Sequence, residues 1–542
     1  NSAKKDLFGA AQVKKINEKI SKAVLKYEKR QNRKRSHSSM LHRICRHQHH
    51  LLRRCLSTTA SADVPLSAEA LLLRATAGDP TYVARDLIKT GHRVSSDLIP
   101  HTATQAVCDA YRAYDDDTQR TDFLVTLARD MHLDHADTTD AIQAASALTH
   151  SDTPDRHRRV TSQLRKTLTP AYETLFSRML AQVPDGMSFL VDLRADLLRN
   201  IRRLSRNSTS SSSNNINNDV ETLRYLKDLD MNMKRSMMEW FSMSFLSLEK
   251  VTMDMPGHVL DKIVMGEKVH PIDTFAALRQ RLGHGRRCYA FFHPSLPRIP
   301  LAFVHVALLD EIADRMDVIT GDDLSPTNEQ KATAAIFYSI SSTQPGLSGV
   351  DLGNFLIKRV AKDVSRELPC VTEYSTLSPI PGLKQWMTRR GVQLLRDGAI
   401  EGVDVALGTK VAHFLEELEQ LKELKELKES KKESKEQVVL LRARDMDEDV
   451  RHVVGKAAAH YLYHEKLRGK MMCPVGNFHV RNGAEVWRLN VEGGDYTQRG
   501  ASNSYGVMVN YKYNLCDVEE NNEQYVLSGT VKSSEQFQTW LA

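Results

Sequence analysis

The spacing of apolar positions changes near residue 250, and this change predicts two kinds of domain. From about Ser67 to Lys250, apolar side chains recur every three or four positions with charged residues between them, as in 158–182 and 187–204. This spacing is typical of amphipathic helices. Few β-branched runs or hairpin signals interrupt it. We therefore predict an all-α N-terminal domain over residues 63–240.

A tract rich in serine and asparagine, SRNSTSSSSNNINN, interrupts the helical pattern after Leu204. Its side chains are small and polar, so they offer almost nothing to a hydrophobic core. This composition is typical of flexible segments. We predict a flexible insert over residues 205–219.

Beyond residue 250 the apolar runs become short or alternating, which predicts a mixed α/β domain over residues 241–542 and an α+β multidomain fold for the chain. VMVNYKYN (507–514) predicts a strand with Tyr511 and Tyr513 on one face. In NFHVRNGAEVWRLNV (477–491), an Asn-Gly pair separates two alternating segments and predicts a hairpin. Three further strands are predicted in CYAFFH (288–293), PLAFVHVALL (300–309) and ATAAIFYSIS (332–341).

A highly charged stretch, FLEELEQLKELKELKESKKESKEQ, occupies residues 414–437. Its leucines recur every three positions from Leu415 to Leu427. On a helix, each step of three leaves the next leucine about 60° behind the last, so the leucines wind around the axis. No continuous coiled-coil seam results. We predict a solvated, charged helical insert at about 414–437.

The net charge of +7 comes from the first 60 residues. These hold 16 Lys and Arg against 3 Asp and Glu, whereas the remainder holds 59 against 65. The body of the chain is therefore mildly acidic, which argues against nucleic-acid binding through a basic surface. No apolar run approaches the roughly 20 residues that a membrane-spanning helix needs. We expect no nucleic acid and no membrane as a partner.

The basic leader, residues 1–62, has the composition of a mitochondrial targeting segment. From Met40 it reads MLHRICRHQHHLLRRCLSTTASADVP, with several arginines and no acidic residue before Asp63. Arginine-rich, serine-rich and acid-poor composition is typical of transit peptides. We expect a transit segment at 40–61 and a location in the mitochondrial matrix; a basic tail on a cytoplasmic protein is the alternative. The C-terminal Thr-Trp-Leu-Ala is not a peroxisomal signal.

The cysteines are scattered along the chain. No two have Cys-x-x-Cys spacing, and none is grouped with histidines at the spacing of zinc ligands. This pattern predicts reduced thiols, no disulfide framework and no metal site. Their positions are 45, 55, 108, 288, 370, 473 and 516.

A glycine-rich turn follows one predicted strand, within TAAIFYSISSTQPGLSGVDLGNFLIKRV at residues 333–360. The strand ends at about Ser342, and a helix follows the glycines. This order can aim backbone N–H groups at a phosphate, whose charge the helix N-terminus favours. The glycine spacing fits neither a Walker A motif nor GxGxxG. A simple connecting turn is the other interpretation.

The stretch TLSPIPG, residues 376–382, places Ser378 directly before a Pro-Ile-Pro-Gly run. Each proline fixes its own φ and removes a backbone N–H, so the loop is stiff and non-helical. Such a loop either connects two elements or holds a hydroxyl still for chemistry. The residues alone leave both roles open, because serine and proline are ordinary turn residues.

Taken together and in order, a series of segments resembles the malonyl-CoA decarboxylase family, and the glycine-rich turn resembles the acyl-CoA-binding turn of the GNAT acetyltransferase superfamily. The resemblance implies a helical N-terminal domain, a GNAT-like mixed α/β catalytic domain, and a homo-oligomer, usually a tetramer. The segments are FLVDLRADLL (189–198), EWFSMSFLSLEKVT (239–252), VHPI (269–272), RRCYAFFH (286–293), the turn at 333–360, LSPIPG (377–382), YLYHEKLRGK (461–470), PVGNFHVRNGAEVWRLN (474–490) and NYKY (510–513).

The resemblance also implies site residues. The family's catalytic serine lies in the Ser-Pro-Ile-Pro-Gly loop and corresponds to Ser378; its catalytic histidine follows Asn-Phe and corresponds to His479. Both are expected to contact the substrate. The Asn-Tyr-x-Tyr strand adds Tyr513 as a possible pocket residue. In the turn, aspartate at 351 stands where the family has the longer glutamate. The CoA-binding turn corresponds to Ser348, Gly349, Val350, Asp351, Leu352, Gly353 and Asn354.

The implied reaction converts malonyl-CoA to acetyl-CoA and CO2. Loss of CO2 leaves an electron pair on C2, which the thioester carbonyl accepts as an enolate, so no cofactor is expected. The protein must orient the carboxylate, stabilise the thioester oxygen and protonate C2. Ser378 is the candidate for the carboxylate and His479 for the proton. The hairpin prediction places His479 on a strand.

Three other activities remain alternatives. A GNAT acyltransferase would use the same turn but would pass the acyl group to an amine. A Ser/His thioesterase fits less well, because the chain lacks a Gly-x-Ser-x-Gly elbow and the residue after Ser378 has no N–H for an oxyanion hole. A non-catalytic acyl-CoA-binding protein is the third.

Overall fold

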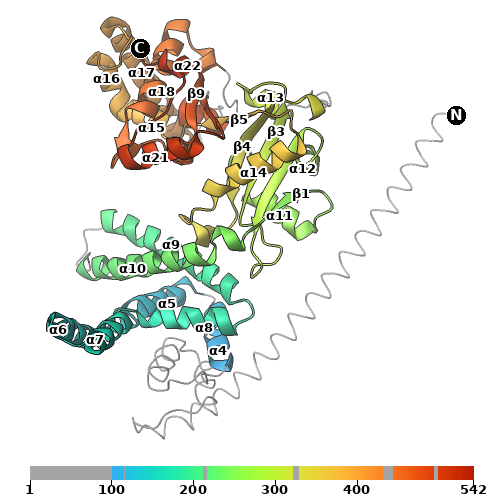
Figure 1. Ribbon diagram of the computed structural model, residues 1–542. Helices are drawn as coiled ribbons and strands as arrows, with labels where there is room; N and C mark the ends of the chain where they lie inside the picture. Colours follow the sequence, from blue (N-terminus) through green and yellow to red (C-terminus); the bar gives the residue numbers. More distant parts are fainter. Residues whose placement is uncertain (1–100, 115, 211–215, 321–328, 431–442, 493–497) are drawn as a thin grey trace. The chain divides into compact units, whose positions relative to one another are not determined.

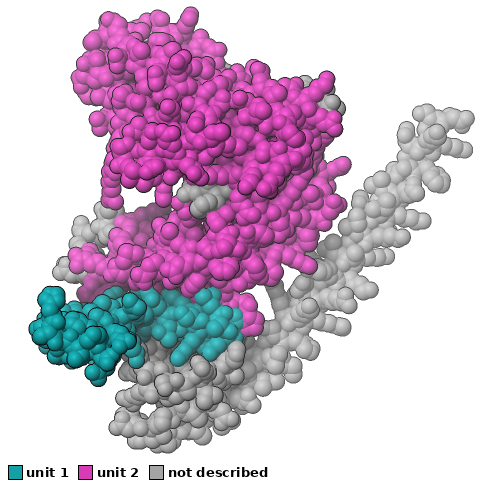
Figure 2. Space-filling model, in the orientation of Figure 1, with its two compact units in different colours: residues 1–183 teal, residues 184–542 magenta. Residues whose placement is uncertain are grey.

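The structure is a computed structural model that describes residues 101–114, 116–210, 216–320, 329–430, 443–492 and 498–542. The chain forms two compact units that separate between Val183 and Pro184 (Figure 2). The leader predicted at 1–62 lies outside the described residues. None of the described helices is both long and apolar enough to cross a membrane.

The described part of the first unit is helical. Asp116, Asp134 and Thr153 each accept a backbone N–H at the start of a helix, which satisfies donors that the helix itself leaves unpaired. Within the helical segment at 158–182, Pro170 separates two helices, because the residue before a proline is driven out of helical conformation. The helices are α4 (His101–Arg112), α5 (Asp117–Asp130), α6 (His135–Ser146), α7 (Pro154–Thr167) and α8 (Ala171–Gln182).

Two long helices, α9 (Gly186–Ser210) and α10 (Ile216–Trp240), open the second unit and pack against each other. Helix therefore extends from both sides into the tract 205–219, which we predicted as a flexible insert; residues 211–215 lie outside the described part. The two helices bury apolar side chains that include Leu190, Leu193, Leu197, Leu226, Leu229 and Met233.

An eight-stranded sheet forms the centre of the second unit, in the order β1-β2-β3-β4-β5-β10-β6, with β9 paired to β10. Neighbouring strands are antiparallel except β4 and β5, which are parallel. The runs predicted as strands at 288–293, 300–309 and 332–341 are confirmed as β2, β3 and β4. The strands are β1 (Ser247–Val251), β2 (Arg286–Phe292), β3 (Ala302–Leu309), β4 (Ala334–Ser342), β5 (Glu373–Thr376), β6 (Ser378–Pro379), β9 (Glu485–Asn490) and β10 (Met508–Lys512).

Strands β4 and β5 pair at one end only. Their register ends at Phe337 and Thr376, and β4 continues beyond this point without β5. A register shift in the β3–β4 ladder lies beside the same place, and such irregularities bend a strand. The chain then passes through η3 (Pro345–Leu347) into α14 (Gly353–Glu367), which packs across β3 and β4 (Figure 1). The predicted order of strand, turn and helix is confirmed.

Two helices, α11 (Gly257–Gly266) and α12 (Phe275–Arg281), form a core with one face of β1, β2 and β3. This core includes Ile263, Leu278 and Phe303, all buried. Every residue of β2 and β3 is buried, which explains why their sequences read as nearly continuous apolar runs.

The charged helix predicted at 414–437 is part of a longer packed helix, α17 (Val405–Ser430). Val411 and Ala412, which precede the predicted insert, and Leu415 at its start are buried, and α17 packs against the helices α16 and α18. The charged insert at about 414–437 stays a prediction. Residues 431–442 lie outside the described part. The remaining elements are α13 (Met316–Thr320), α15 (Leu383–Trp386), α16 (Val392–Arg396), α18 (Glu448–Tyr463), β7 (Lys466–Leu467), β8 (Lys470–Met471), α20 (Gln498–Ser504), α21 (Val518–Ser528) and α22 (Glu535–Gln538).

The hairpin predicted at 477–491 is wrong: a helix, α19 (Pro474–Arg481), precedes β9. Pro474 occupies the first helical turn, where its missing N–H costs nothing. Gly483 has a φ of +86° and donates its N–H to the Val480 carbonyl, which closes the helix. An Asn-Gly pair supplies positive φ in a hairpin or after a helix, so the preceding Pro474 was the discriminating signal.

Candidate active site

Ser378 lies on the short strand β6, opposite Val509 of β10. Only 5% of its surface is exposed. Its hydroxyl donates to Thr376 Oγ1 at 2.9 Å, and its Oγ lies 3.3 Å from His479 Nε2. The stiff proline loop therefore holds this hydroxyl in a buried position beside an imidazole.

His479 lies on α19, not on a strand as we predicted, and it is buried. Its Nδ1 is 2.8 Å from the Tyr513 hydroxyl. Its ring stacks on Tyr511, with centroids 4.7 Å apart and planes at 21°. Tyr511 and Tyr513 are two positions apart, so they point to the same side of the extended chain, as predicted. A helix thus supplies the imidazole, and the end of a strand orients it.

The hydrogen bonds indicate which nitrogen of His479 carries the proton. Burial lowers the pKa of His479 to about 3, so the imidazole is neutral near pH 7 and has one N–H donor and one acceptor. Because Ser378 donates to Thr376, its Oγ accepts from Nε2–H. Nδ1 is then the acceptor for the Tyr513 hydroxyl, whose pKa burial raises well above its usual range. The proton is assigned to Nε2 from these partners.

Thr376 is a site residue that the sequence analysis missed. Its Oγ1 accepts from Ser378 and also from the Tyr511 backbone N–H at 3.1 Å. Its carbonyl accepts from the Asn510 side chain at 2.6 Å. The sequence did carry a signal for Thr376, because this residue precedes Ser378 by two positions. Residues two apart in an extended segment point to the same face.

The turn predicted to bind CoA lies between η3 and α14. Ser348 and Gly349 are exposed, Val350 and Asp351 are half-buried, and Leu352 is buried. Leu352 caps α14 without a side-chain hydrogen bond, so the first N–H groups of this helix have no side-chain acceptor at the cap. Gly353 and Asn354 begin α14; the Asn354 side chain lies outside the described part.

Two contacts join this turn to the helix that carries His479. The Asp351 carboxylate lies 3.3 Å from the Arg481 guanidinium. A Cβ atom on Gly353 would lie 2.8 Å from the Phe478 ring, so glycine allows the close approach of α14 and α19. Phe478 and Arg481 flank His479 along α19. The structure therefore places the predicted CoA turn beside the helix that carries the predicted catalytic histidine.

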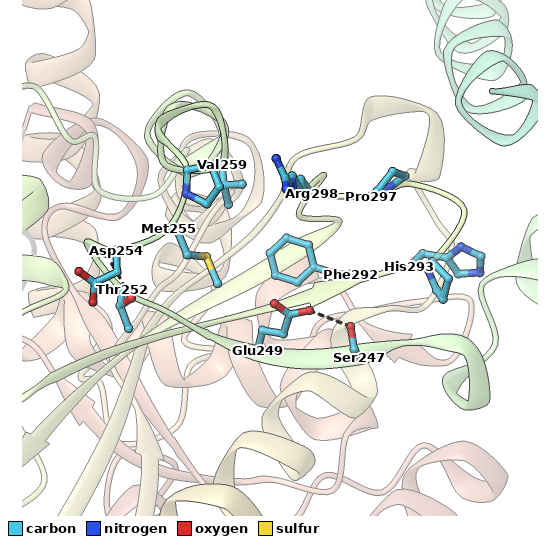
Figure 3. A pocket seen from close by; sticks show the side chains of 12 residues that line it. Ser247, Glu249, Thr252, Asp254, Met255, Val259, Phe292, His293, Pro297 and Arg298 are labelled. Carbon is cyan, nitrogen blue, oxygen red and sulfur yellow. Dashed lines mark hydrogen bonds between the residues drawn. The ribbon is translucent and has the colours of Figure 1, made fainter. Parts of the chain in front are cut away.

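A separate cleft of about 550 Å³ lies at the β1 end of the sheet, with Phe292 at its centre (Figure 3). Glu249 accepts a hydrogen bond from Ser247 on its wall. None of the residues that line this cleft belongs to the predicted site. Among the described residues, no group of three or more His, Cys, Asp or Glu side chains is arranged to hold a metal ion.

Comparison with known families adds an independent line of evidence. Residues 244–542 match the model of the malonyl-CoA decarboxylase C-terminal domain, and residues 132–241 match the model of the N-terminal domain. The chain belongs to the malonyl-CoA decarboxylase family. The two family models meet near residue 242, whereas the two compact units separate between Val183 and Pro184. The domain boundary that we place at 240 stays a prediction.

Relatives and solved structures agree with this membership. The mitochondrial malonyl-CoA decarboxylase of Anser anser anser is 34% identical over 430 residues, covering 79% of this chain and 80% of its own. That of Mus musculus is 33% identical over 450 residues, covering 78% and 82%. The malonyl-CoA decarboxylase structure from Rhodopseudomonas palustris has a TM-score of 0.68 at 30% identity and covers 85% of this chain and 98% of its own. The one from Agrobacterium vitis has a TM-score of 0.65 at 27% identity, with 86% and 100% covered. The predicted helical N-terminal region and sheet-containing C-terminal domain are confirmed.

Proposed function

We propose that this protein decarboxylates malonyl-CoA to acetyl-CoA and CO2 with Ser378 and His479 as its catalytic residues. Family membership supports the reaction. The main support for these two residues is the contact between Ser378 Oγ and His479 Nε2 at 3.3 Å. The two residues are 101 positions apart in the chain. A hydroxyl and an imidazole held together in a buried site are suited to orienting a carboxylate and moving a proton.

In this mechanism, Ser378 turns its hydroxyl from Thr376 to the malonyl carboxylate. The strand pairing of β6 holds Oγ in place, so the carboxylate is fixed relative to the thioester plane. The C–C bond to the carboxylate then breaks and CO2 leaves. The electron pair that remains on C2 is delocalised into the thioester carbonyl as an enolate.

His479 then protonates C2 from Nε2–H. The enolate carbon is a much stronger base than water, so a neutral imidazole can donate to it and no imidazolium is required. The Tyr513 hydroxyl donates to Nδ1 and stabilises the imidazole that has given up its proton. A proton from solvent later restores Nε2–H. This assignment agrees with the low pKa that burial imposes on His479.

The turn from Ser348 to Asn354 binds the CoA moiety in this proposal, and the catalytic domain is GNAT-like. Three features support it: β4 diverges from β5, the β3–β4 register shifts beside the divergence, and a glycine-rich turn leads into the N-terminus of α14. A helix N-terminus with free N–H groups favours phosphate.

Location and assembly are part of the same proposal. The relatives from Anser anser anser and Mus musculus are named as mitochondrial, which agrees with the transit-like composition at 40–61. We propose the mitochondrial matrix as the location and a homo-tetramer as the assembly. Light scattering of the purified full chain would measure the assembly: a monomer mass would contradict it.

The proposed reaction is tested with the purified full chain, malonyl-CoA and no added cofactor. We expect equal amounts of acetyl-CoA and CO2. Ser378→Ala and His479→Ala should each lower kcat at least ~100-fold, because positioned acid–base groups contribute about 10²–10⁴. Ser528→Ala and His413→Ala change exposed residues of the same types and should leave kcat unchanged.

Other products would identify one of the alternatives. Free CoA and malonate would indicate a thioesterase. Turnover that appears only when an amine is added would indicate an acyltransferase. Equal binding of malonyl-CoA and acetyl-CoA without any product would indicate a non-catalytic acyl-CoA-binding protein.

A further inference from the structure

The helical pair α9 and α10 also holds the turn in place. Arg194 of α9, only 1% exposed, donates to the carbonyls of Gly346 and Ser348. Its Nε donates to the Asp230 carboxylate of α10 at 2.8 Å. A buried guanidinium with these partners fixes the backbone of the turn. If its hydrogen bonds were broken, a buried charge and two carbonyl groups would be left unpaired.

A second cation from the same helices lies over the turn. Lys234 is one helical turn beyond Asp230 on α10, and its Nζ lies 3.2 Å from the position that a Cβ atom on Gly349 would occupy. Glycine has no side chain there, so the ammonium approaches the exposed backbone directly. Gly349 also has a φ of +76°, a conformation that glycine adopts without strain.

The Lys234 ammonium has no anionic partner among the described residues. The two carboxylates associated with this region are already paired, Asp230 with Arg194 and Asp351 with Arg481. Within the same described residues, the Gly349 N–H has no backbone acceptor. The cap of α14 likewise lacks a side-chain acceptor. Donors and a positive charge therefore gather at the exposed turn, where both nearby carboxylates already have cationic partners.

We propose that Lys234 binds a phosphate group of the CoA moiety. This inference rests on the proposed function, because it assumes that the turn binds CoA. It adds a residue from the helical part of the chain to the substrate site. The phosphates do not change during decarboxylation, so Lys234 stabilises the bound substrate and the transition state equally. Its loss therefore raises KM and leaves kcat unchanged.

The experiment compares the full-length chain with Lys234→Met, which keeps the length of the side chain and removes its charge. Two substrates are used: malonyl-CoA, and malonyl-pantetheine, which ends in a hydroxyl and carries no phosphate. We expect Lys234→Met to raise KM for malonyl-CoA about tenfold, as the loss of one charge-assisted hydrogen bond predicts. The kcat should stay within about twofold, and KM for malonyl-pantetheine should not change.

Two further variants serve as controls. Lys234→Arg keeps the charge and should restore most of the affinity for malonyl-CoA. Lys227→Met removes an exposed lysine two turns earlier on α10 and should behave like the parent. An unchanged KM for malonyl-CoA in Lys234→Met would overturn the proposal. So would an equal rise in KM for malonyl-pantetheine, because that substrate offers no phosphate to bind.

Failure of the proposed reaction would be visible separately, as a parent chain that releases no CO2 from malonyl-CoA. In that case calorimetric titration with CoA decides the role of Lys234. Binding by the parent that weakens about tenfold in Lys234→Met supports the phosphate contact. Equal binding by both chains, or no binding by the parent, overturns it.

Discussion

At the scale of single residues, the site depends on side chains that keep one another neutral and oriented. His479 is buried between the hydroxyls of Ser378 and Tyr513 and stacks on Tyr511. Burial disfavours its charged form, and this cause alone accounts for its low pKa. A neutral imidazole has one proton to give, and the hydrogen bonds direct that proton toward Ser378. The proton transfer that we propose for His479 therefore depends on the direction of these hydrogen bonds.

Tyr513→Phe tests this view, because it removes only the hydroxyl that donates to Nδ1. The stacking of Tyr511 on His479 is left in place. We expect kcat to fall about 10- to 100-fold, as the loss of a strong hydrogen bond in the transition state predicts. KM should change little. Steady-state kinetics with malonyl-CoA measures both.

The matched control is Tyr463→Phe. Its hydroxyl makes no hydrogen bond with another described residue, and its ring contact with Lys466 would remain. It should leave kcat unchanged. A Tyr513→Phe variant as active as the parent would mean that the hydroxyl only fills space.

At the scale of elements, the turn proposed to bind CoA is positioned by its close approach to α9. A Cβ atom on Gly346 would lie 1.8 Å from the Val191 carbonyl oxygen, an overlap that neither backbone can relieve by a small shift. The residues on both sides of this contact are buried. The turn thus has its shape because η3 packs directly on a helix that precedes the sheet in sequence.

Gly346→Ala should therefore push η3 away from α9. We expect the free energy of unfolding to fall by about 1–3 kcal/mol, the usual cost of overpacking, and CoA binding to weaken. Urea unfolding and calorimetry measure the two effects. Gly257→Ala is the control: an added Cβ there meets nothing within 4 Å, so stability should change by less than about 0.5 kcal/mol. Equal stability of the two variants would contradict the packing argument.

At the scale of the whole molecule, burial of neutral histidines links folding to pH. His305 of β3 is fully buried, with Nε2 3.5 Å from the Glu267 carboxylate. Ser339 donates its hydroxyl to the same carboxylate. Burial is the main cause that lowers the pKa of His305 to about 4, and the pKa of His479 falls to about 3. Both lie far below the ordinary value of 6.5.

Stability should therefore fall as the solution is acidified from about pH 6.5. Below this pH the unfolded chain binds protons on these two histidines while the folded chain does not, so stability is fully present above 6.5 and is lost on acidification. Each histidine contributes a slope of about 1.4 kcal/mol per pH unit until its folded pKa is reached. Urea unfolding between about pH 7 and pH 5 measures how the free energy of unfolding changes with pH. Most carboxylates titrate below this range, so they contribute little to the slope.

His479→Gln removes one of the two groups and should make the pH dependence shallower. The same unfolding measurements on this variant supply the comparison. A free energy of unfolding that is constant between about pH 7 and pH 5 in the parent would show that these histidines are not held neutral.

Much of the fold was predictable because burial leaves a direct pattern in the sequence. The runs 288–293, 300–309 and 332–341 became strands, and the glycine-rich segment became a turn before a helix. The error at 477–491 has a local cause: an Asn-Gly pair permits positive φ after a helix as readily as in a hairpin. Helix α17 begins before the charged stretch from which a helix was predicted, and Val411 and Ala412 in this earlier part are buried.

The sequence by itself determined the helical N-terminal region, the strands β2, β3 and β4 with the turn and helix that follow β4, the stiff loop at Ser378 and the family to which the chain belongs. Those features are local or are carried by motifs in order along the chain. Only the tertiary structure decided that His479 meets Ser378 and Tyr513, that Thr376 accepts from Ser378, and that Lys234 lies over Gly349. These contacts join residues on separate elements, and their distances depend on how helices pack against the sheet. Periodicity and composition report burial and turns, but they do not specify which distant side chains come within hydrogen-bonding distance.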